Sequence, residues 1–187
     1  KMISVILPTY NSVQTLKRSV DSVINQKGAF KIELIIINDC SKDNTKKYLE
    51  SLINKDRISF IKINNEENFG VGFCRKLGIM RAKGEFIAFI DADDYWLDDK
   101  LICQLDTLRN NPEFKICFSN YLIEAKNEKF YLEKKRKIIT ASTNKYINEI
   151  PFSTAIIYSK LAKEFHYPSI RIRNDYIFWN NILKSSK

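Results

Sequence analysis

The chain has 187 residues, a formal net charge of +9 at pH 7 and 44% hydrophobic residues, which fits one globular domain with a real core. No apolar run is long enough to cross a bilayer and no leader pattern opens the sequence, so we expect a cytosolic protein. The four cysteines form no CxxC pair, which predicts buried, reduced thiols rather than a disulfide framework. The sequence also lacks a dinucleotide fingerprint, a P-loop and a serine elbow, and this argues against the enzymes that depend on those motifs.

Short apolar runs alternate with amphipathic segments in the first 111 residues. The runs predict buried strands at Met2–Leu7, Ile32–Ile37, Ile58–Ile63 and Phe86–Ile90. The segments between and after them predict helices near residues 13–25, 45–52, 71–82 and 101–108. Four strand–helix units in a row predict an α/β fold with a doubly wound, mostly parallel sheet.

The pattern changes after Pro112. Lys115–Ala125 and Lys129–Leu132 predict a hairpin, Phe152–Tyr158 another strand, and Asn174–Lys184 a helix. No linker separates these elements from the first half. We therefore expect a single domain, 1–187, in which 1–111 is a nucleotide-binding half and 112–187 a mixed half.

Three carboxylates, Asp91, Asp93 and Asp94, follow the strand that ends at Ile90, and we call Asp91–Asp94 the acidic turn. Like charges this close repel one another unless a cation lies between them. A hard divalent cation that also binds phosphate oxygens is the natural candidate. The alternative is a solvated turn that caps the next helix, and this stretch alone leaves both interpretations open.

Other polar residues also follow predicted strands. Tyr10, Asp39, Asn68 and Asp91 come at or just after strand ends, and the carboxyl ends of parallel strands meet at one edge of a sheet. Tyr10 offers a face for stacking, and Asp39 suits a donor group on a base or ribose. Arg75 lies on a predicted helix, where it can reach a diphosphate or pair with an acid. Each has a structural alternative: packing for Tyr10, a cap of the Thr45 helix for Asp39, and a surface ion pair for Arg75.

Five stretches occur in the order found in a known family. They are ILPTYN, IIINDCSKDNT, NFGVGFCRKLGI, FIAFIDADD and RNDYIFW. With them the chain resembles glycosyltransferase family 2 from Met2 to about Leu183. The resemblance implies a GT-A fold and an inverting transfer of a sugar from a nucleotide-diphosphate donor, a UDP-sugar, to an acceptor hydroxyl.

The resemblance also assigns roles to individual residues. It implies that Asp175 is the catalytic base and that Asp93 binds a divalent metal, Mn²⁺ or Mg²⁺. The residues that it places at the donor are Pro8, Thr9, Tyr10, Asp39, Asn68, Gly70, Arg75, Asp91 and Ala92. The chemistry fits these roles, because a cation stabilises the charge of the leaving diphosphate and a carboxylate can take the proton of the acceptor hydroxyl.

The chain departs from the family pattern at three positions. Asn174 stands before Asp175 where the family often has Glu, Asn38 replaces the first acid of the usual Asp-Asp pair, and Lys76 replaces a common Asn. The first change keeps open a catalytically silent nucleotide-sugar binding module. A sugar nucleotidyltransferase is a further alternative, but the first strand is not followed by the glycine-rich basic loop that it needs.

The remaining expectations concern partners and packing. A basic cluster comprises Lys126, Lys129, Lys134, Lys135, Arg136 and Lys137, which either forms a solvated hairpin or contacts an anionic membrane surface. No RNA-binding signature accompanies it, so no nucleic-acid partner is expected. The resemblance implies a glycan or lipid-linked acceptor in bacterial surface glycan synthesis, at the inner face of the membrane. His166 is interpreted as a packing residue rather than a metal ligand, and Trp96 and Trp179 as core residues.

Overall fold

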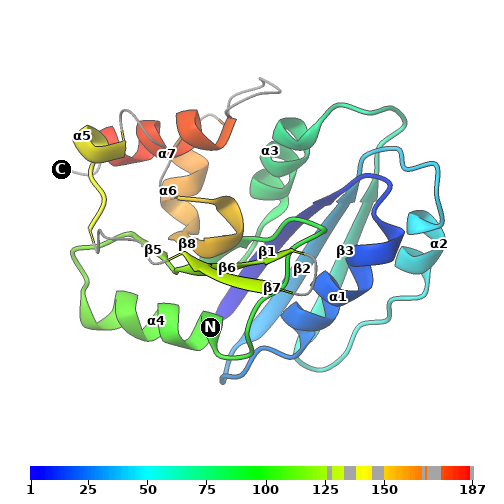
Figure 1. Ribbon diagram of the computed structural model, residues 1–187, viewed down its shortest axis with the longest axis horizontal. Coiled ribbons are helices and arrows are strands. Elements are labelled where there is room, and N and C mark those ends of the chain that lie inside the picture. The colour runs from blue at the N-terminus through cyan, green and yellow to red at the C-terminus, as the bar shows by residue number, and fades with distance from the viewer. Residues whose placement is uncertain (126–127, 133–137, 145–149, 166, 168–173, 186–187) are drawn as a thin grey trace.

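A computed structural model describes residues 1–125, 128–132, 138–144, 150–165, 167 and 174–185. A six-stranded sheet in the order β3-β2-β1-β4-β8-β5 runs through it, with helices on both faces (Figure 1). Its parallel strands are β1 (Met2–Thr9), β2 (Lys31–Asn38), β3 (Ile58–Asn64) and β4 (Phe86–Phe89). β8 (Ala155–Tyr158) runs antiparallel to both β4 and β5 (Ile116–Phe118). The predicted mostly parallel sheet is confirmed.

The helices fall into two layers, one on each face of the sheet. One layer holds α1 (Val13–Ile24), α2 (Thr45–Glu50) and α4 (Lys100–Asn110). The other holds α3 (Val71–Arg81), α5 (Ala141–Asn144), α6 (Ser159–Glu164) and α7 (Asn174–Ser185), as Figure 1 shows. Each layer encloses its own hydrophobic core against the sheet, so β1, β2 and β4 are buried on both faces, while the edge strand β3 is only partly buried.

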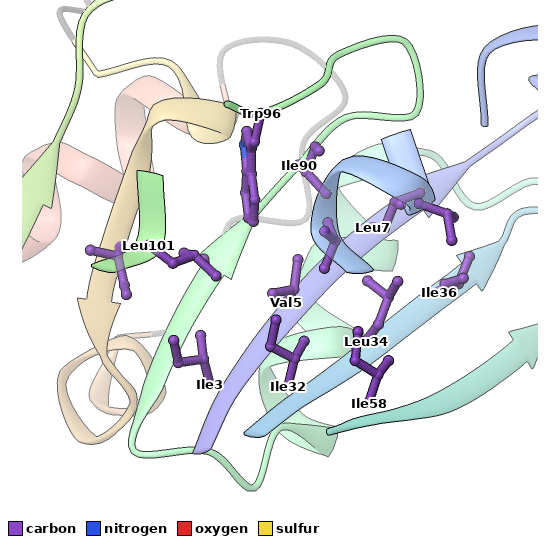
Figure 2. Packing of buried hydrophobic residues seen from close by; sticks show 14 of the residues in the cluster. Ile3, Val5, Leu7, Ile32, Leu34, Ile36, Ile58, Ile90, Trp96 and Leu101 are labelled. Carbon is purple, nitrogen blue, oxygen red and sulfur yellow. The ribbon is translucent and has the colours of Figure 1, made fainter. Parts of the chain in front are cut away.

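Strand β1 shows why the buried strands are continuous apolar runs. Ile3, Val5 and Leu7 belong to the core beneath α1, while Ile6 between them belongs to the core beneath α3. Successive side chains of a strand point to opposite faces, so both sets must be apolar. Figure 2 shows the first set packed beside the matching side chains of β2. Each buried Ile or Leu stabilises the fold by about 1.5–3 kcal/mol.

The second half departs from the predicted elements at two places. The predicted hairpin forms from β6 (Tyr121–Ala125) and β7 (Glu128–Leu132), but its expected start at Lys115 is wrong. Ile116–Phe118 instead pairs with β8, where the central sheet offers a buried partner. The predicted strand from Phe152 begins with a 3₁₀ turn, η1 (Phe152–Thr154). The turn forms because both the amide and the hydroxyl of Thr154 donate to the carbonyl of Pro151, at 3.0 and 2.7 Å.

Strand β4 is fixed beside β1 by a close backbone approach at the amino end of the sheet. The amide of Gly84 donates to Ser4 Oγ at 2.8 Å, and Ser4 Oγ donates to the buried carboxylate of Glu33 at 2.5 Å. A Cβ on Gly84 would lie 2.6 Å from the backbone nitrogen of Ser4. Only glycine fits there without moving one of the two backbones.

Several smaller expectations can be compared with the structure. All four cysteines are free thiols, and Cys74 is buried, but the expectation of burial is wrong for Cys103, which is exposed on α4. Trp96 and Trp179 are buried as predicted. No helix among the described residues is long and apolar enough to cross a bilayer. His166, Lys126, Lys134, Lys135, Arg136, Lys137 and the side chain of Lys129 lie outside the described part of the chain.

Candidate active site

The carboxyl ends of the parallel strands meet at one edge of the sheet, as predicted. The parallel ladder continues past the strands, because the amide of Asp39 donates to the Thr9 carbonyl at 2.9 Å and that of Asn65 to the Asn38 carbonyl at 2.9 Å. β4 ends opposite Ile6, whereas β1 continues to Thr9. The acidic turn therefore begins on the same edge of the sheet, but closer to its middle than the ends of β1 and β2.

The turns after β1 and β2 are joined to each other. The Asn11 amide donates to Ser41 Oγ at 2.9 Å, and the Lys42 amide donates to Asn11 Oδ1 at 2.7 Å. Asn11 has a φ of 48°, a left-handed conformation that asparagine tolerates. Tyr10, directly before it, is 48% exposed. Its ring is therefore available at the sheet edge, as its predicted stacking role requires.

Asp39 caps helix α3. It is only 3% exposed, and its carboxylate accepts hydrogen bonds from Asn65 Nδ2 at 2.7 Å and from the amides of Phe69 and Gly70 at 3.0 and 2.7 Å. A carboxylate at a helix N-terminus is favoured by the orphan amides and the dipole there. Gly70 has a φ of 88°, which suits glycine. The contact of Asp39 with a donor stays a prediction.

The alternative role considered for Asp39, a cap of the helix that starts at Thr45, is wrong. Asp43 takes that position, since its carboxylate accepts the amides of Thr45 and Val13 at 3.0 and 3.1 Å. Desolvation acts to raise the pKa of Asp43, but hydrogen bonds from the Thr45 side chain and from the amides of Thr45 and Val13 outweigh it and lower the pKa. Asp43 thereby joins the starts of α1 and α2.

The predicted donor residue Asn68 lies beside Asp39. Its Nδ2 is 3.4 Å from the Asp39 carbonyl.

Arg75 joins the acidic turn to helix α7. Its Nη2 donates to Asp91 Oδ1 at 2.5 Å and its Nη1 donates to Asn174 Oδ1 at 3.0 Å. The guanidinium also lies 4.1 Å from the ring centroid of Phe152. Burial acts to lower the pKa of Arg75, but the neighbouring Asp91 and Tyr167 outweigh it and the pKa is raised. Arg75 thus pairs with an acid, and the surface position considered for it is wrong because the residue is buried.

Tyr167 connects the same network to Asp175. Its hydroxyl donates to Asn174 Oδ1 at 2.7 Å, so one amide oxygen accepts from both Tyr167 and Arg75. Burial raises the pKa of Tyr167, Arg75 opposes the rise, and the charges of Asp175 and Asp91 add to it. The charges of Asp175, the candidate base, and of Asp91 in the acidic turn therefore both affect the pKa of the Tyr167 hydroxyl. Asp175 itself lies in the first turn of α7, as predicted.

The acidic turn carries the electrostatic repulsion that its sequence predicts. Burial raises the pKa of Asp94, and the charges of Asp91 and Asp93 raise it further against a hydrogen bond from Ser153. The Ser153 hydroxyl also accepts the amide of Asp91 at 3.1 Å, and the Ser153 carbonyl accepts Trp96 Nε1 at 2.8 Å. Ser153 therefore anchors both ends of the turn to η1.

The carboxylates of the turn fit a cation only if a ligand completes its coordination. Among the described residues no group of three or more His, Cys, Asp or Glu side chains is placed to hold a metal ion. Asp93 is exposed, whereas Asp91 is engaged with Arg75. Mg²⁺ is typically bound by one or two carboxylates together with substrate phosphates. The oxygen donors here fit a metal that is shared with a diphosphate, rather than one enclosed by the protein.

The sequence profile of Glycosyl transferase family 2 matches residues 4–180. The chain belongs to glycosyltransferase family 2. Among curated relatives of this family 2 member, the Escherichia coli protein named UDP-Glc:alpha-D-GlcNAc-diphosphoundecaprenol beta-1,3-glucosyltransferase WfgD is 33% identical, over 99% of this chain and 71% of WfgD.

Solved structures agree on the GT-A fold of the family 2 member. Staphylococcus aureus TarS 1–349 in complex with UDP-GlcNAc has a TM-score of 0.75 at 22% identity, over 95% of this chain and 52% of that one. The mannosyltransferase PcManGT from Pyrobaculum calidifontis, in complex with GDP-Man and Mn²⁺, has a TM-score of 0.73 at 18% identity, over 96% and 51%. The chain thus spans about half the length of these two solved proteins.

The predicted site residues of this glycosyltransferase fall into two groups. One lies at the tips of β1 and β2 and the start of α3: Pro8, Thr9, Tyr10, Asp39, Asn68 and Gly70. The other lies around the acidic turn and α7: Arg75, Asp91, Ala92, Asp93 and Asp175. Helix α3 carries a member of each group, Gly70 at its start and Arg75 in its second turn, and so links them.

Sequence reasoning missed two residues of this network, Tyr167 and Ser153. Tyr167 stands among aromatic residues before a proline, a context that indicates packing more often than hydrogen bonding. Ser153 lies inside a run interpreted as a strand. A tyrosine near the helix that carries the base candidate was the one available signal for the first, and none was available for the second.

Proposed function

We propose that this glycosyltransferase moves a sugar from a UDP-sugar to an acceptor hydroxyl, with inversion at the anomeric carbon. The observation that carries the proposal is the bridge from Asp91 through Arg75 to Asn174, which holds the start of α7 against the acidic turn. This bridge holds Asp91, a proposed donor residue, beside helix α7, which carries the proposed base Asp175. TarS, which shares the fold, has been solved with UDP-GlcNAc, and this supports a UDP-sugar as the donor.

The donor is proposed to lie along the tips of β1 and β2. Exposed Tyr10 supplies a face on which a base can stack. Asp39 accepts a hydrogen bond from the base or ribose, and the loop of Asn68 and Gly70, whose Gly70 amide donates to Asp39, lies alongside. Pro8 and Thr9 form the buried floor of this region at the end of β1.

Asp93 is proposed to hold Mn²⁺ or Mg²⁺ jointly with the diphosphate, and Asp91 and Ala92 to adjoin the ribose. The solved complex of PcManGT with GDP-Man and Mn²⁺ supports a metal of this kind. When bound, such an ion stabilises the negative charge that develops on the leaving diphosphate. Arg75, held between Asp91 and Asn174, fixes the acidic turn relative to α7 while this happens.

Asp175 is proposed to take the proton of the acceptor hydroxyl. It lies in the first turn of α7, at the positive end of the helix dipole. The acceptor oxygen then bonds to the anomeric carbon on the face opposite the diphosphate, while the bond from that carbon to the diphosphate breaks, which releases UDP and inverts the configuration. Asn174 orients the base by anchoring the same helical turn to Arg75 and Tyr167.

The acceptor is proposed to be a lipid-linked glycan at the inner face of a bacterial membrane. The name of WfgD specifies GlcNAc on diphosphoundecaprenol, which supports an acceptor of this class. In this proposal residues 1–111 hold the donor and residues 112–187, which include Asp175, face the acceptor. The protein would then act in the cytoplasm, in the synthesis of a surface polysaccharide.

Titration with UDP, GDP, ADP and dTDP, with and without Mn²⁺, tests the donor part of the proposal. We expect UDP to bind most tightly and Mn²⁺ to strengthen its binding. Asp175→Asn is then expected to lower transfer at least about 100-fold while UDP binding stays unchanged. The surface variant Asp106→Asn is the control and should keep full activity. Tight UDP-sugar binding without any turnover by the unchanged protein would instead leave a silent binding module.

A further inference from the structure

Helix α1 holds the backbone of the acidic turn from the side opposite Arg75. Ser19 Oγ lies 2.8 Å from the Ala92 carbonyl and 2.6 Å from the Asp94 carbonyl. Arg18 Nη2 lies 3.4 Å from the carbonyl of Asp93, between them. Two adjacent side chains of one helix thus contact three successive carbonyls. Ser19 is fully buried, so its hydroxyl finds no water to replace these acceptors.

Arg18 extends this contact to a third element. Its guanidinium carbon lies 4.4 Å from the ring centroid of Tyr95, the residue after the acidic turn. Its Nη1 lies 3.3 Å from the carboxylate of Glu124 on β6, which brings the β6–β7 hairpin beside α1. One guanidinium therefore contacts the acidic turn, the residue that follows it and the hairpin.

We propose that Ser19 and Arg18 are positioning residues that hold the acidic turn so that the Asp93 carboxylate is directed at the metal. The inference rests on the proposed function, in which Asp93 is the metal ligand. The contacts of Ser19 and Arg18 with three successive carbonyls fix the peptide planes on both sides of Asp93. These planes determine where the Asp93 side chain points. The turn needs such support because the mutual repulsion of its three carboxylates favours any arrangement that separates them.

The first test compares two serines of the same helix. Ser19→Ala removes the hydroxyl that contacts the turn, whereas Ser22→Ala removes one that donates to the Ser19 carbonyl within α1, at 2.7 Å. We expect Ser19→Ala to weaken Mn²⁺ binding to the UDP complex about tenfold, since loss of a group behind a metal ligand typically has this effect. Binding of UDP without metal should not change, and Ser22→Ala should match the unchanged protein in both titrations.

The second test compares Arg18 with its neighbour. Lys17 is also exposed and paired, with Asp21 on its own helix at 2.5 Å, but it does not touch the turn. Arg18→Gln is expected to weaken Mn²⁺ binding about threefold, Arg18→Lys to restore part of it, and Lys17→Gln to leave it unchanged. Because the Arg18 side chain is 53% exposed, this variant folds even if Ser19→Ala does not.

Asp93→Ala separates the failure of this inference from that of the proposed function. If Asp93→Ala abolishes Mn²⁺ binding and Ser19→Ala and Arg18→Gln do not weaken it, the positioning role is overturned and the metal site stands. If Asp93→Ala leaves Mn²⁺ binding unchanged, the metal assignment fails and the positioning role fails with it. Equal loss of Mn²⁺ affinity in Ser19→Ala and Ser22→Ala would also overturn the inference, because a general loosening of α1 would then explain both.

Discussion

Two arginines hold the acidic turn from opposite faces of the sheet, and their surroundings differ. Arg75 on the α3 side is 7% exposed in its side chain and binds the carboxylate of Asp91 at 2.5 Å. Arg18 on the α1 side is 53% exposed and makes contacts of 3.3–3.4 Å with Glu124 and the Asp93 carbonyl. A pair with one buried partner, such as Arg75 with Asp91, is costlier to break than an exposed pair, which is worth little by itself. We therefore expect Arg75 to contribute more to the stability of the turn than Arg18 does.

The largest expected effect is the loss of the Arg75 guanidinium. Arg75→Met leaves Asp91 without its cation and removes one of the two hydrogen bonds that Asn174 Oδ1 accepts, so we expect the free energy of unfolding to fall by about 3 kcal/mol. Urea unfolding measures it, and Arg109→Met is the control, because Arg109 pairs with Asp106 at the surface. Equal losses in the two variants would show that the pair of Arg75 with Asp91 contributes no more to stability than an exposed ion pair.

Lys100, on the α1 side, sharpens the comparison because it is a half-buried charge that pairs with no carboxylate among the described residues. Its Nζ lies 4.2 Å from the ring centroid of Trp96 and donates to Gln104 Oε1 at 2.8 Å. Burial lowers the pKa of Lys100 from 10.5 to about 7, with a small opposing effect from Cys117. Below pH 7 the ammonium is charged in both states and destabilises the fold fully. As the pH rises from 7 to 10.5, only the unfolded chain keeps the proton, so this destabilisation fades.

Lys100→Met is therefore expected to raise the melting temperature by about 2–4 °C at pH 6. The gain should shrink steadily above pH 7 and vanish near pH 10.5. Thermal unfolding at several pH values measures it, with the exposed Lys47→Met as a control. A gain that is independent of pH would show that packing, rather than the charge, accounts for it.

Tyr167→Phe probes the α3 side with a smaller change. It removes one of the two hydrogen bonds that Asn174 Oδ1 accepts, so we expect a loss of about 1 kcal/mol. Tyr158→Phe is the matched control, since that ring packs on Phe86 and no described hydrogen bond of its hydroxyl is lost. Chemical unfolding compares the two variants, and a loss of equal size in both would remove Tyr167 from the network.

The smallest expected effect is the coupling between Arg18 and Glu124. A double-mutant cycle with Arg18→Gln and Glu124→Gln should give a coupling of about 0.2–1 kcal/mol, as for other exposed ion pairs. The coupling should fall further at high salt, because screening reaches this pair. A coupling as large as that of Arg75 with Asp91 would show that the two faces do not differ.

The fold was largely predictable because its signals are local. Continuous apolar runs mark β1 to β4 in the sequence, and their parallel arrangement is enough to predict that Tyr10, Asp39 and Asp91 lie at one edge. The network was less predictable because its hydrogen bonds join distant segments. No residue near Asp39 in the sequence indicates that its carboxylate binds the amide of Gly70, directly before the helix that begins at Val71.

The contact made by Ser19 was hidden for a different reason. It lies on the buried side of an amphipathic helix, where a small polar residue is easily taken as a filler between the apolar ones. A hairpin start at Lys115 was predicted because edge strands and hairpin strands have the same alternation, and only pairing with β8 distinguishes them.

The amide at position 174 has a consequence for how the joint between α3 and α7 responds to acid. The side-chain oxygen of Asn174 accepts hydrogen bonds from Arg75 and Tyr167. Unlike a carboxylate, this amide does not become protonated when the pH falls. The guanidinium does not titrate in the working range of proteins, and the raised pKa of Tyr167 keeps its hydroxyl a donor in alkali. The hydrogen bonds among Arg75, Asn174 and Tyr167 therefore persist at acidic pH values at which a glutamate at position 174 would become protonated and neutral.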